Sequence, residues 1–209
     1  MAPSSRGPNG TPLSDAALVD KLLTVMEQEV MPTTAKGVEK GNKVFGAAIL
    51  DADFRVVVAS TNHEAVCPFW HGEVHTLKEF FALPASSRPK QEDCYFLCTH
   101  APCPMCLSAL TWSGFKVLYQ FFSYDDSEGT FNIPYDNQVL REVFQCKRPR
   151  RSTPYYDSYD LRELVQHGAL SDDERASAWR RIRQIESEYD RLSEVYQQRK
   201  HLSTNIMLK

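Results

Sequence analysis

Two short stretches of the sequence carry side chains that bind metals or transfer protons. "HGE" contains His71 and Glu73, and "PCPMC" contains Cys103 and Cys106. Zinc prefers thiolate and imidazole ligands, and a hydrolytic zinc site keeps one of its four positions open for water. His71, Cys103 and Cys106 supply the three protein ligands that such a site needs. The residue types therefore predict a site for zinc (Zn2+) with one position free for chemistry.

The spacing of these residues supports the same interpretation. The two cysteines lie three positions apart, so both thiolates of a first helical turn can reach one ion. The unsatisfied N–H groups and the dipole at a helix start favour the thiolate form. Glu73 lies two residues beyond His71, where its carboxylate can enter the same pocket without binding the metal. A carboxylate there can take a proton from water and return it to a leaving amine, so we predict Glu73 as the catalytic residue.

Other interpretations of the cysteine pair stay open at this stage. An isolated C-x-x-C pair also occurs in structural zinc sites, in redox pairs and among core cysteines. A structural zinc site would want a fourth ligand, and the spare candidates are His75, Cys98 and His100. A structural ion has no use for Glu73, which favours the catalytic interpretation.

Composition limits the class of protein. With 209 residues and 42% hydrophobic content, the chain can form one substantial α/β core with room for an appendage. A net charge of -3 gives no overall attraction to phosphate backbones, so a nucleic acid partner is not expected.

We find no run of about 18 apolar residues and no apolar centre of a secretory signal near the N-terminus. We therefore expect a cytoplasmic protein without membrane contact, whose six cysteines are free or metal-bound.

Hydrophobic periodicity predicts the elements that position the site. A helix follows the capping residue Ser14, and two apolar runs at 43–50 and 54–60 form a hairpin. Helices are expected at 71–83 and 103–115, and buried strands at 94–99 and 116–122. One more short helix is expected at 138–144. This order predicts an α/β fold, a three-layer α/β/α sandwich with a mixed central sheet.

The motifs resemble those of a known family. H-x-E followed by P-C-x-x-C is the signature of the zinc deaminases. From about Val44 to Tyr135 the chain resembles the cytidine deaminase superfamily, and within it the guanine deaminases and the tRNA adenosine deaminases. "VFGAAIL", "TNHE" and "PCPMCLSALTW" carry the resemblance. It implies a zinc-dependent aminohydrolase that converts an exocyclic amine of a small nucleobase-like heterocycle to a carbonyl and releases ammonia.

The resemblance also implies residues that contact the substrate. Asn62 matches an asparagine that hydrogen-bonds the substrate, although it could instead cap a turn. Phe45 and Trp112 match aromatics of the pocket, with core packing as the alternative for both, and Gly72 keeps a backbone N–H that could face the substrate. Independently of the resemblance, Trp70 and its neighbour Phe69 could stack on a flat heterocycle or hold their loop down.

The chain also departs from the family pattern. Ala101 stands where the family usually has Glu, and Asn132 and Ile133 replace acidic residues of the guanine deaminases. The sequence therefore does not identify the heterocycle. Two alternative functions stay open, a deaminase acting on a base in tRNA or other RNA and an inactive deaminase-like scaffold with structural zinc.

The C-terminal part follows a different pattern. Residues 146–160 are polar, basic and aromatic, which is typical of a linker or of an ordered loop over the core. A capping box at Ser171 then opens a helix of about 25 residues, with an apolar stripe that needs a partner surface. We predict a disordered tail at 1–13, a zinc deaminase domain at 14–145 and a C-terminal extension at 146–209. The stripe could pack on the protein's own core, on a partner protein or on a second subunit, and we expect a homo-oligomer, a dimer first.

Overall fold

The computed structural model describes residues 13–202, so the predicted disorder of 1–13 lies almost entirely outside the described residues. A mixed five-stranded sheet forms the centre, in the order β2-β1-β3-β4-β5. Its strands are β1 (Gly46–Leu50), β2 (Val56–Thr61), β3 (Tyr95–His100), β4 (Val117–Phe122) and β5 (Asp157–Asp160). β1 pairs antiparallel with β2 and β3, whereas β4 pairs parallel with β3 and β5.

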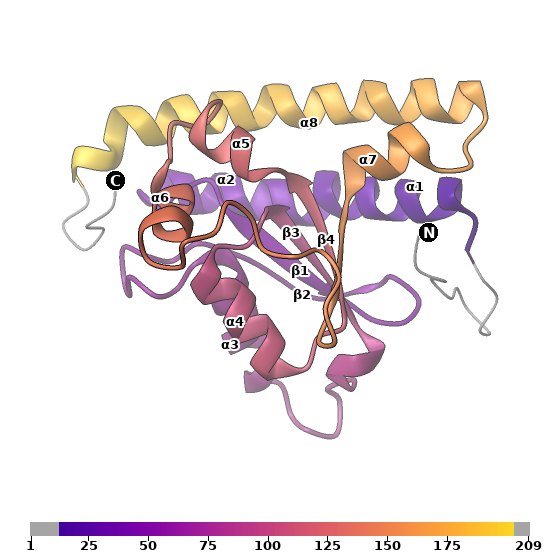
Figure 1. The fold of residues 1–209 in the computed structure, drawn as a ribbon, viewed down its shortest axis with the longest axis horizontal. Coiled ribbons are helices and arrows are strands. Elements are labelled where there is room, and N and C mark those ends of the chain that lie inside the picture. Colours follow the sequence, from indigo (N-terminus) through magenta and orange to yellow (C-terminus); the bar gives the residue numbers. More distant parts are fainter. Residues whose placement is uncertain (1–12, 203–209) are drawn as a thin grey trace.

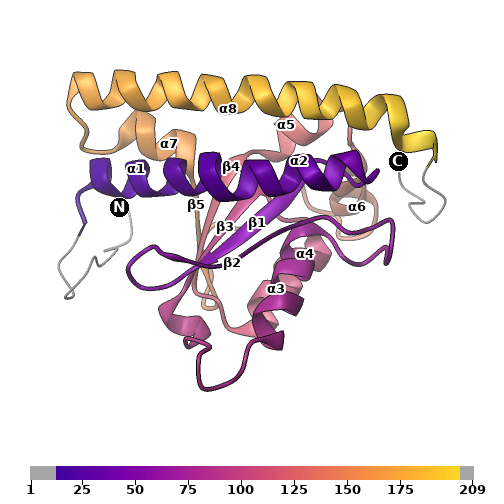
Figure 2. The same ribbon diagram turned by 180° about the vertical axis from the view of Figure 1, so that it is seen from behind.

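Helices cover both faces of this sheet (Figures 1 and 2). One face carries α1 (Asp15–Val25), the π-type turn η2 (Met26–Val30), α2 (Met31–Glu39) and the long α8 (Asp172–Arg199). The other face carries α3 (Gly72–Ala82) and α4 (Pro104–Ser113). Shorter helices are η3 (Gln91–Asp93), α5 (Tyr124–Glu128), α6 (Tyr135–Glu142), α7 (Leu161–His167) and η4 (Lys200–Leu202). The predicted three-layer sandwich and the long C-terminal helix are confirmed.

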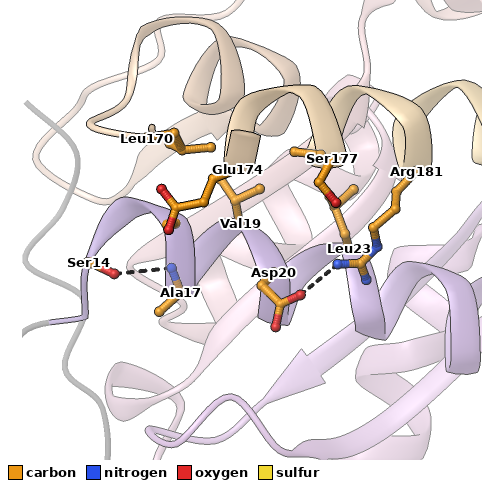
Figure 3. Close-up of a pocket in the computed structure, with 11 residues that line it drawn as sticks. Ser14, Ala17, Val19, Asp20, Leu23, Leu170, Glu174, Ser177 and Arg181 are labelled. Carbon is orange, nitrogen blue, oxygen red and sulfur yellow. Dashed lines mark hydrogen bonds and ion pairs between the residues drawn. The ribbon is translucent and has the colours of Figure 1, made fainter. Parts of the chain in front are cut away.

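The apolar stripe of α8 packs on the protein's own core. α8 runs alongside α1 and α2 (Figure 2), and its buried side chains belong to the same core cluster as Leu18 and Leu22 of α1. Between the start of α1 and the start of α8 lies a pocket of about 380 Å³ (Figure 3). Arg181 of α8 reaches across to Asp20 at 2.7 Å and to Glu27 at 2.8 Å. The stripe therefore has its partner surface within the chain and does not supply a surface for a second subunit.

No helix in residues 13–202 has the length and apolar character required to cross a bilayer.

This packing predicts a large stability cost for truncating the stripe. Ile185 is 1% exposed, and replacing a buried isoleucine by alanine costs about 2–5 kcal/mol, because transfer energy is lost and a cavity remains. We therefore expect Ile185→Ala to lower the free energy of unfolding by that amount in urea denaturation. The control is Gln184→Ala on the exposed face, which should change it by less than about 0.5 kcal/mol. Equal effects would contradict the packing of α8 on the core.

One strand lies where a linker or loop was expected. β5 falls inside the basic and aromatic segment and pairs with β4 from Val117↔Asp157 to Gln120↔Asp160. It has only four residues, "DSYD", at the edge of the sheet, where one side of the strand needs no partner. Such a short polar strand shows no apolar alternation, so the pattern rules could not find it.

Candidate metal and catalytic site

The ends of three elements bring the predicted metal ligands together. β3 leads into α4, and α3 begins beside it, so the starts of both helices lie at the same end of the sheet. His71 and Cys103 are the N-cap residues of α3 and α4, both with extended backbone, and Cys106 lies in the first turn of α4. The nitrogen and sulfur atoms that could bind a metal in these three residues all lie within 4.8 Å of one another.

The geometry of this cluster fits zinc. Tetrahedral zinc with a Zn–S bond of about 2.3 Å and a Zn–N bond of about 2.0 Å separates the nitrogen from the sulfur by roughly 3.5 Å. His71 Nδ1 and Cys103 Sγ are 3.5 Å apart. Two thiolates and one imidazole are also the donor types that zinc prefers. His71, Cys103 and Cys106 can therefore hold the ion and leave a fourth position open.

The candidates for a fourth protein ligand lie elsewhere. His75 Nδ1 is 2.7 Å from Ser60 Oγ and 3.0 Å from the carbonyl oxygen of Thr61. Cys98 belongs to the core cluster between the sheet and α3, and His100 Nδ1 is 2.9 Å from Thr99 Oγ1. Among the described residues, the metal-ligating group has the three members named above. This is the ligand number of a hydrolytic zinc site rather than of a structural one.

Glu73 lies beside the cluster in the first turn of α3. Its side chain is buried, with 6% of the residue exposed. Burial and the negative charge of Cys103 raise the pKa of Glu73 to about 7. A carboxyl group with a pKa near neutrality can both accept and donate a proton at physiological pH, which is what a general acid and base needs.

The ligands themselves form a coupled set of charges. Burial opposes the charged form of His71, but the hydrogen bond and the charge of Cys103 outweigh it and raise the pKa of His71 to about 9. A hydrogen bond from Cys106 holds the pKa of the Cys103 thiol well below its usual range. Burial raises the pKa of Cys106. Binding of a cation at this cluster therefore displaces protons held by the thiols and the imidazole.

A cavity of about 300 Å³ opens on the ligands His71 and Cys103. Its apolar lining includes Phe45, Phe69 and Ile133, and its ionisable lining includes Lys43, Glu64 and Asp136. Burial raises the pKa of Asp136 to about 7. Sequence reasoning missed the three ionisable residues, although Asp136 is the last residue of "GTFNIPYD", the segment in which the chain departs from the guanine deaminases.

Asn62 and Gly72 meet at the start of α3. Asn62 is fully buried, its Oδ1 accepts a hydrogen bond from the N–H of Gly72, and its Nδ2 donates to Glu64 Oε2 at 2.5 Å. A Cβ atom on Gly72 would lie 2.9 Å from the Cα atom of Gly46, so only glycine lets α3 approach β1 this closely. In this structure the Gly72 N–H therefore faces Asn62 and does not face the cavity.

The predicted aromatic residues lie in three different settings. Phe45 lines the cavity and packs edge-on against His100, with 4.4 Å between the ring centroids. Trp70 stacks on His75 at 5.5 Å outside the cavity lining, whereas its neighbour Phe69 lines the cavity and is 67% exposed. Trp112 is 91% exposed and lies neither in the cavity lining nor in the core.

Comparison with protein families gives one match. Residues 21–121 match the family model described as the cytidine and deoxycytidylate deaminase zinc-binding region. This region contains Asn62, His71, Glu73, Cys103 and Cys106, and it runs from within α1 to within β4. Comparison of the sequence with curated proteins gave no match.

Three similar solved structures each have low sequence identity to this chain. Guanine deaminase from Nitrosomonas europaea is 19% identical, with a TM-score of 0.46, over 84% of this chain and 86% of that chain. Guanine deaminase from Bacillus subtilis is 22% identical, with a TM-score of 0.48, over 75% of this chain and 92% of that chain. A structure from a study of A-to-I editing by tRNA:A34 deaminases is 18% identical, with a TM-score of 0.45, over 65% of this chain and 98% of that chain.

Proposed function

The chain belongs to the cytidine deaminase superfamily through its zinc-binding region at residues 21–121, and we propose that it hydrolyses an exocyclic amine of a small nucleobase-like heterocycle with the help of zinc. One observation supports this proposal above the others. The three ligand atoms lie within 4.8 Å of one another, with the buried carboxyl of Glu73 beside them and a cavity opening on them. A hydrolytic site needs a metal position, a proton carrier and room for a substrate in one place.

The residues have separate roles in the proposed reaction. When bound, zinc supplies a Lewis acid that lowers the pKa of water towards neutrality. Glu73 takes a proton from the attacking water and passes it to the ring nitrogen, while the water oxygen bonds to the ring carbon that bears the amine and the C=N double bond of the ring becomes single. Glu73 then carries the proton of the added hydroxyl to the amine nitrogen. The bond between the carbon and the exocyclic nitrogen breaks, ammonia leaves, and the oxygen remains as the ring carbonyl.

The cavity supports a flat, partly polar substrate. Phe45 and Phe69 offer apolar surface to the faces of a ring, while Asp136 offers hydrogen-bond acceptors to its edge. Pockets for small molecules combine apolar walls with a few polar groups that fix the orientation of the ligand. An aminated aromatic heterocycle has that distribution of surface.

A panel of substrates tests the proposed function. The panel holds guanine, adenine, cytosine, their nucleosides, aminated pterins and triazines, and short RNA oligonucleotides, with coupled detection of ammonia. We expect the wild-type protein with zinc to release ammonia from a free heterocycle or nucleoside. Release from RNA alone would favour the RNA-editing alternative. No release from any compound would favour the inactive scaffold.

Asp136 gives a prediction about substrate binding. Asp136→Asn removes the charge but keeps the size of the side chain, and a hydrogen bond to a charged group contributes about 1.5–3 kcal/mol. We therefore expect kcat/KM to fall by about 10- to 100-fold, mainly through a higher KM, for the substrate identified by the panel. Asp93→Asn is the matched control, because Asp93 is exposed at the opposite end of β3. An unchanged KM in Asp136→Asn would contradict contact with the substrate.

Assembly and location remain predictions. We propose a homodimer, although the apolar stripe of α8 that could have formed its interface is buried within the chain. Sedimentation of the purified protein measures this directly. A cytoplasmic location is likewise proposed from the sequence.

A further inference from the structure

Glu64 lies at the centre of a buried polar network that adjoins the metal ligands. The residue is 2% exposed, and its two carboxylate oxygens face three different partners. Oε1 accepts a hydrogen bond from Lys43 Nζ at 2.9 Å and lies 3.5 Å from His71 Nε2. Oε2 accepts a hydrogen bond from Asn62 Nδ2 at 2.5 Å. Neither the family match nor the sequence motif assigns a role to Glu64 or Lys43.

The two nitrogens of the His71 ring face different groups. Nδ1 lies 3.5 Å from Cys103 Sγ, within the cluster that fits zinc, whereas Nε2 faces the carboxylate of Glu64. A neutral imidazole carries one proton, and the nitrogen that binds a metal is the one without it. When Nδ1 binds the ion, the proton is therefore on Nε2 and points towards Glu64.

We propose that Glu64 is a positioning residue for the zinc ligand His71. Its carboxylate accepts a hydrogen bond from the Nε2–H group, fixes the ring orientation in which Nδ1 faces the cysteines, and makes the imidazole a stronger donor to the metal. Outer carboxylates with this role are a general feature of histidine ligands, and removing one costs about 10- to 100-fold in metal affinity or activity. The inference rests on the zinc site of the proposed function and does not depend on the identity of the substrate.

The surroundings of Glu64 provide partners for its buried carboxylate. An ionised carboxylate buried without a partner would cost several kcal/mol, so it needs a counter-charge and hydrogen bonds. Lys43 is 5% exposed and supplies the counter-charge from the segment just before β1. Asn62 supplies a second donor from the end of β2. The ends of two adjacent strands thus hold Glu64 in place opposite the start of α3.

Glu64 and Lys43 also line the cavity, so the competing interpretation is contact with the substrate. The two interpretations predict different measurements. A substrate contact changes KM and leaves the affinity for zinc unchanged, because zinc binds without the substrate. A positioning role changes the affinity for zinc in the absence of any substrate.

A matched pair of double variants separates these roles. Lys43→Met/Glu64→Gln and Lys43→Met/Glu64→Leu both remove the buried charges, so neither leaves an unpaired ammonium group. They differ at position 64 in the oxygen that accepts a hydrogen bond, which glutamine keeps and leucine lacks. The dissociation constant of zinc is measured by competition with a chromophoric chelator. Thermal unfolding of the zinc-free proteins checks that both variants fold.

We expect zinc to bind about 10- to 100-fold more weakly to the leucine variant than to the glutamine variant. Dissociation constants that agree within about twofold would overturn the inference.

If the leucine variant does not fold, Glu64→Asp supplies the test, because it keeps the charge opposite Lys43 but withdraws the carboxylate by one methylene. Weaker zinc binding in Glu64→Asp would support the positioning role, and unchanged binding would overturn it. Failure of the substrate panel would leave this result unaffected, so the two proposals fail separately.

Discussion

Glu73→Gln is expected to lower kcat by between about 10²- and 10⁴-fold, which is the usual contribution of a positioned general acid and base. Glutamine keeps the size of the side chain and its hydrogen-bonding oxygen, but it cannot accept a proton from water or return one to the amine. Glu73 is not a member of the ligand cluster. The variant should therefore bind zinc at the same ratio as the wild type, as elemental analysis of the purified protein would show.

Glu92→Gln is the control for this substitution. Glu92 is exposed on η3, which precedes β3 and so lies at the end of that strand away from α4. The substitution makes the same chemical change outside the cavity lining. We expect its kcat to equal that of the wild type. A Glu73→Gln enzyme with full activity would refute the role of Glu73, whereas lost activity with lost zinc would place the residue among the ligands.

The sequence predicted the ligand cluster because its geometry is local. A cysteine at a helix start and a second one three positions later must lie on the same turn, whatever the rest of the fold does. His71 and Glu73 are likewise fixed relative to each other by the first turn of α3. The only long-range requirement was that two helix starts meet. The structure meets it because β2 and β3 both pair antiparallel with β1, so their C-terminal ends, which precede α3 and α4, lie at the same end of the sheet.

The cavity could not be derived in the same way. Lys43, Glu64 and Asp136 come from three segments that lie outside the regular strands or at the start of a short helix, and no periodicity relates them. Their approach to the metal ligands depends on how the segments after β2 and β4 fold over the sheet. Pattern rules describe the inside of elements far better than the paths between them.

Trp112 shows a different limit of sequence reasoning. The sequence of α4 is apolar on nearly all sides, so periodicity does not indicate which side faces the sheet. In the structure Cys106 and Leu110, four residues apart, face the core and are fully buried. Trp112 lies two residues beyond Leu110, which places its side chain on another side of the helix. Which side a uniformly apolar helix buries is set by its tertiary contacts.

The metal ligands give the second large expected effect. Cys106→Ala removes one of three protein ligands, and losing a ligand should cost more than losing the outer partner of a ligand, which costs up to about 100-fold in affinity. We therefore expect zinc to bind more than about 100-fold more weakly, as measured by chelator competition, and the purified protein to contain little zinc. Turnover should fall with the zinc content, and a chelator should produce the same loss in the wild type.

Cys98→Ala is the matched control for the lost ligand. Cys98 is as deeply buried as Cys106, and it lies in β3 on the strand that leads to the cluster, but it is not a member of the ligand group. Its removal should lower the unfolding free energy slightly, since a small core side chain is lost, and should leave zinc affinity and turnover unchanged.

The zinc contents of the two variants decide between three outcomes. Equal loss of zinc from both variants would mean that the ion depends on the packing of the core near β3. Full zinc in Cys106→Ala would mean that the ion binds elsewhere. Loss confined to Cys106→Ala assigns the metal to the start of α4, where the thiolates, the imidazole and the Glu73 carboxyl adjoin one cavity.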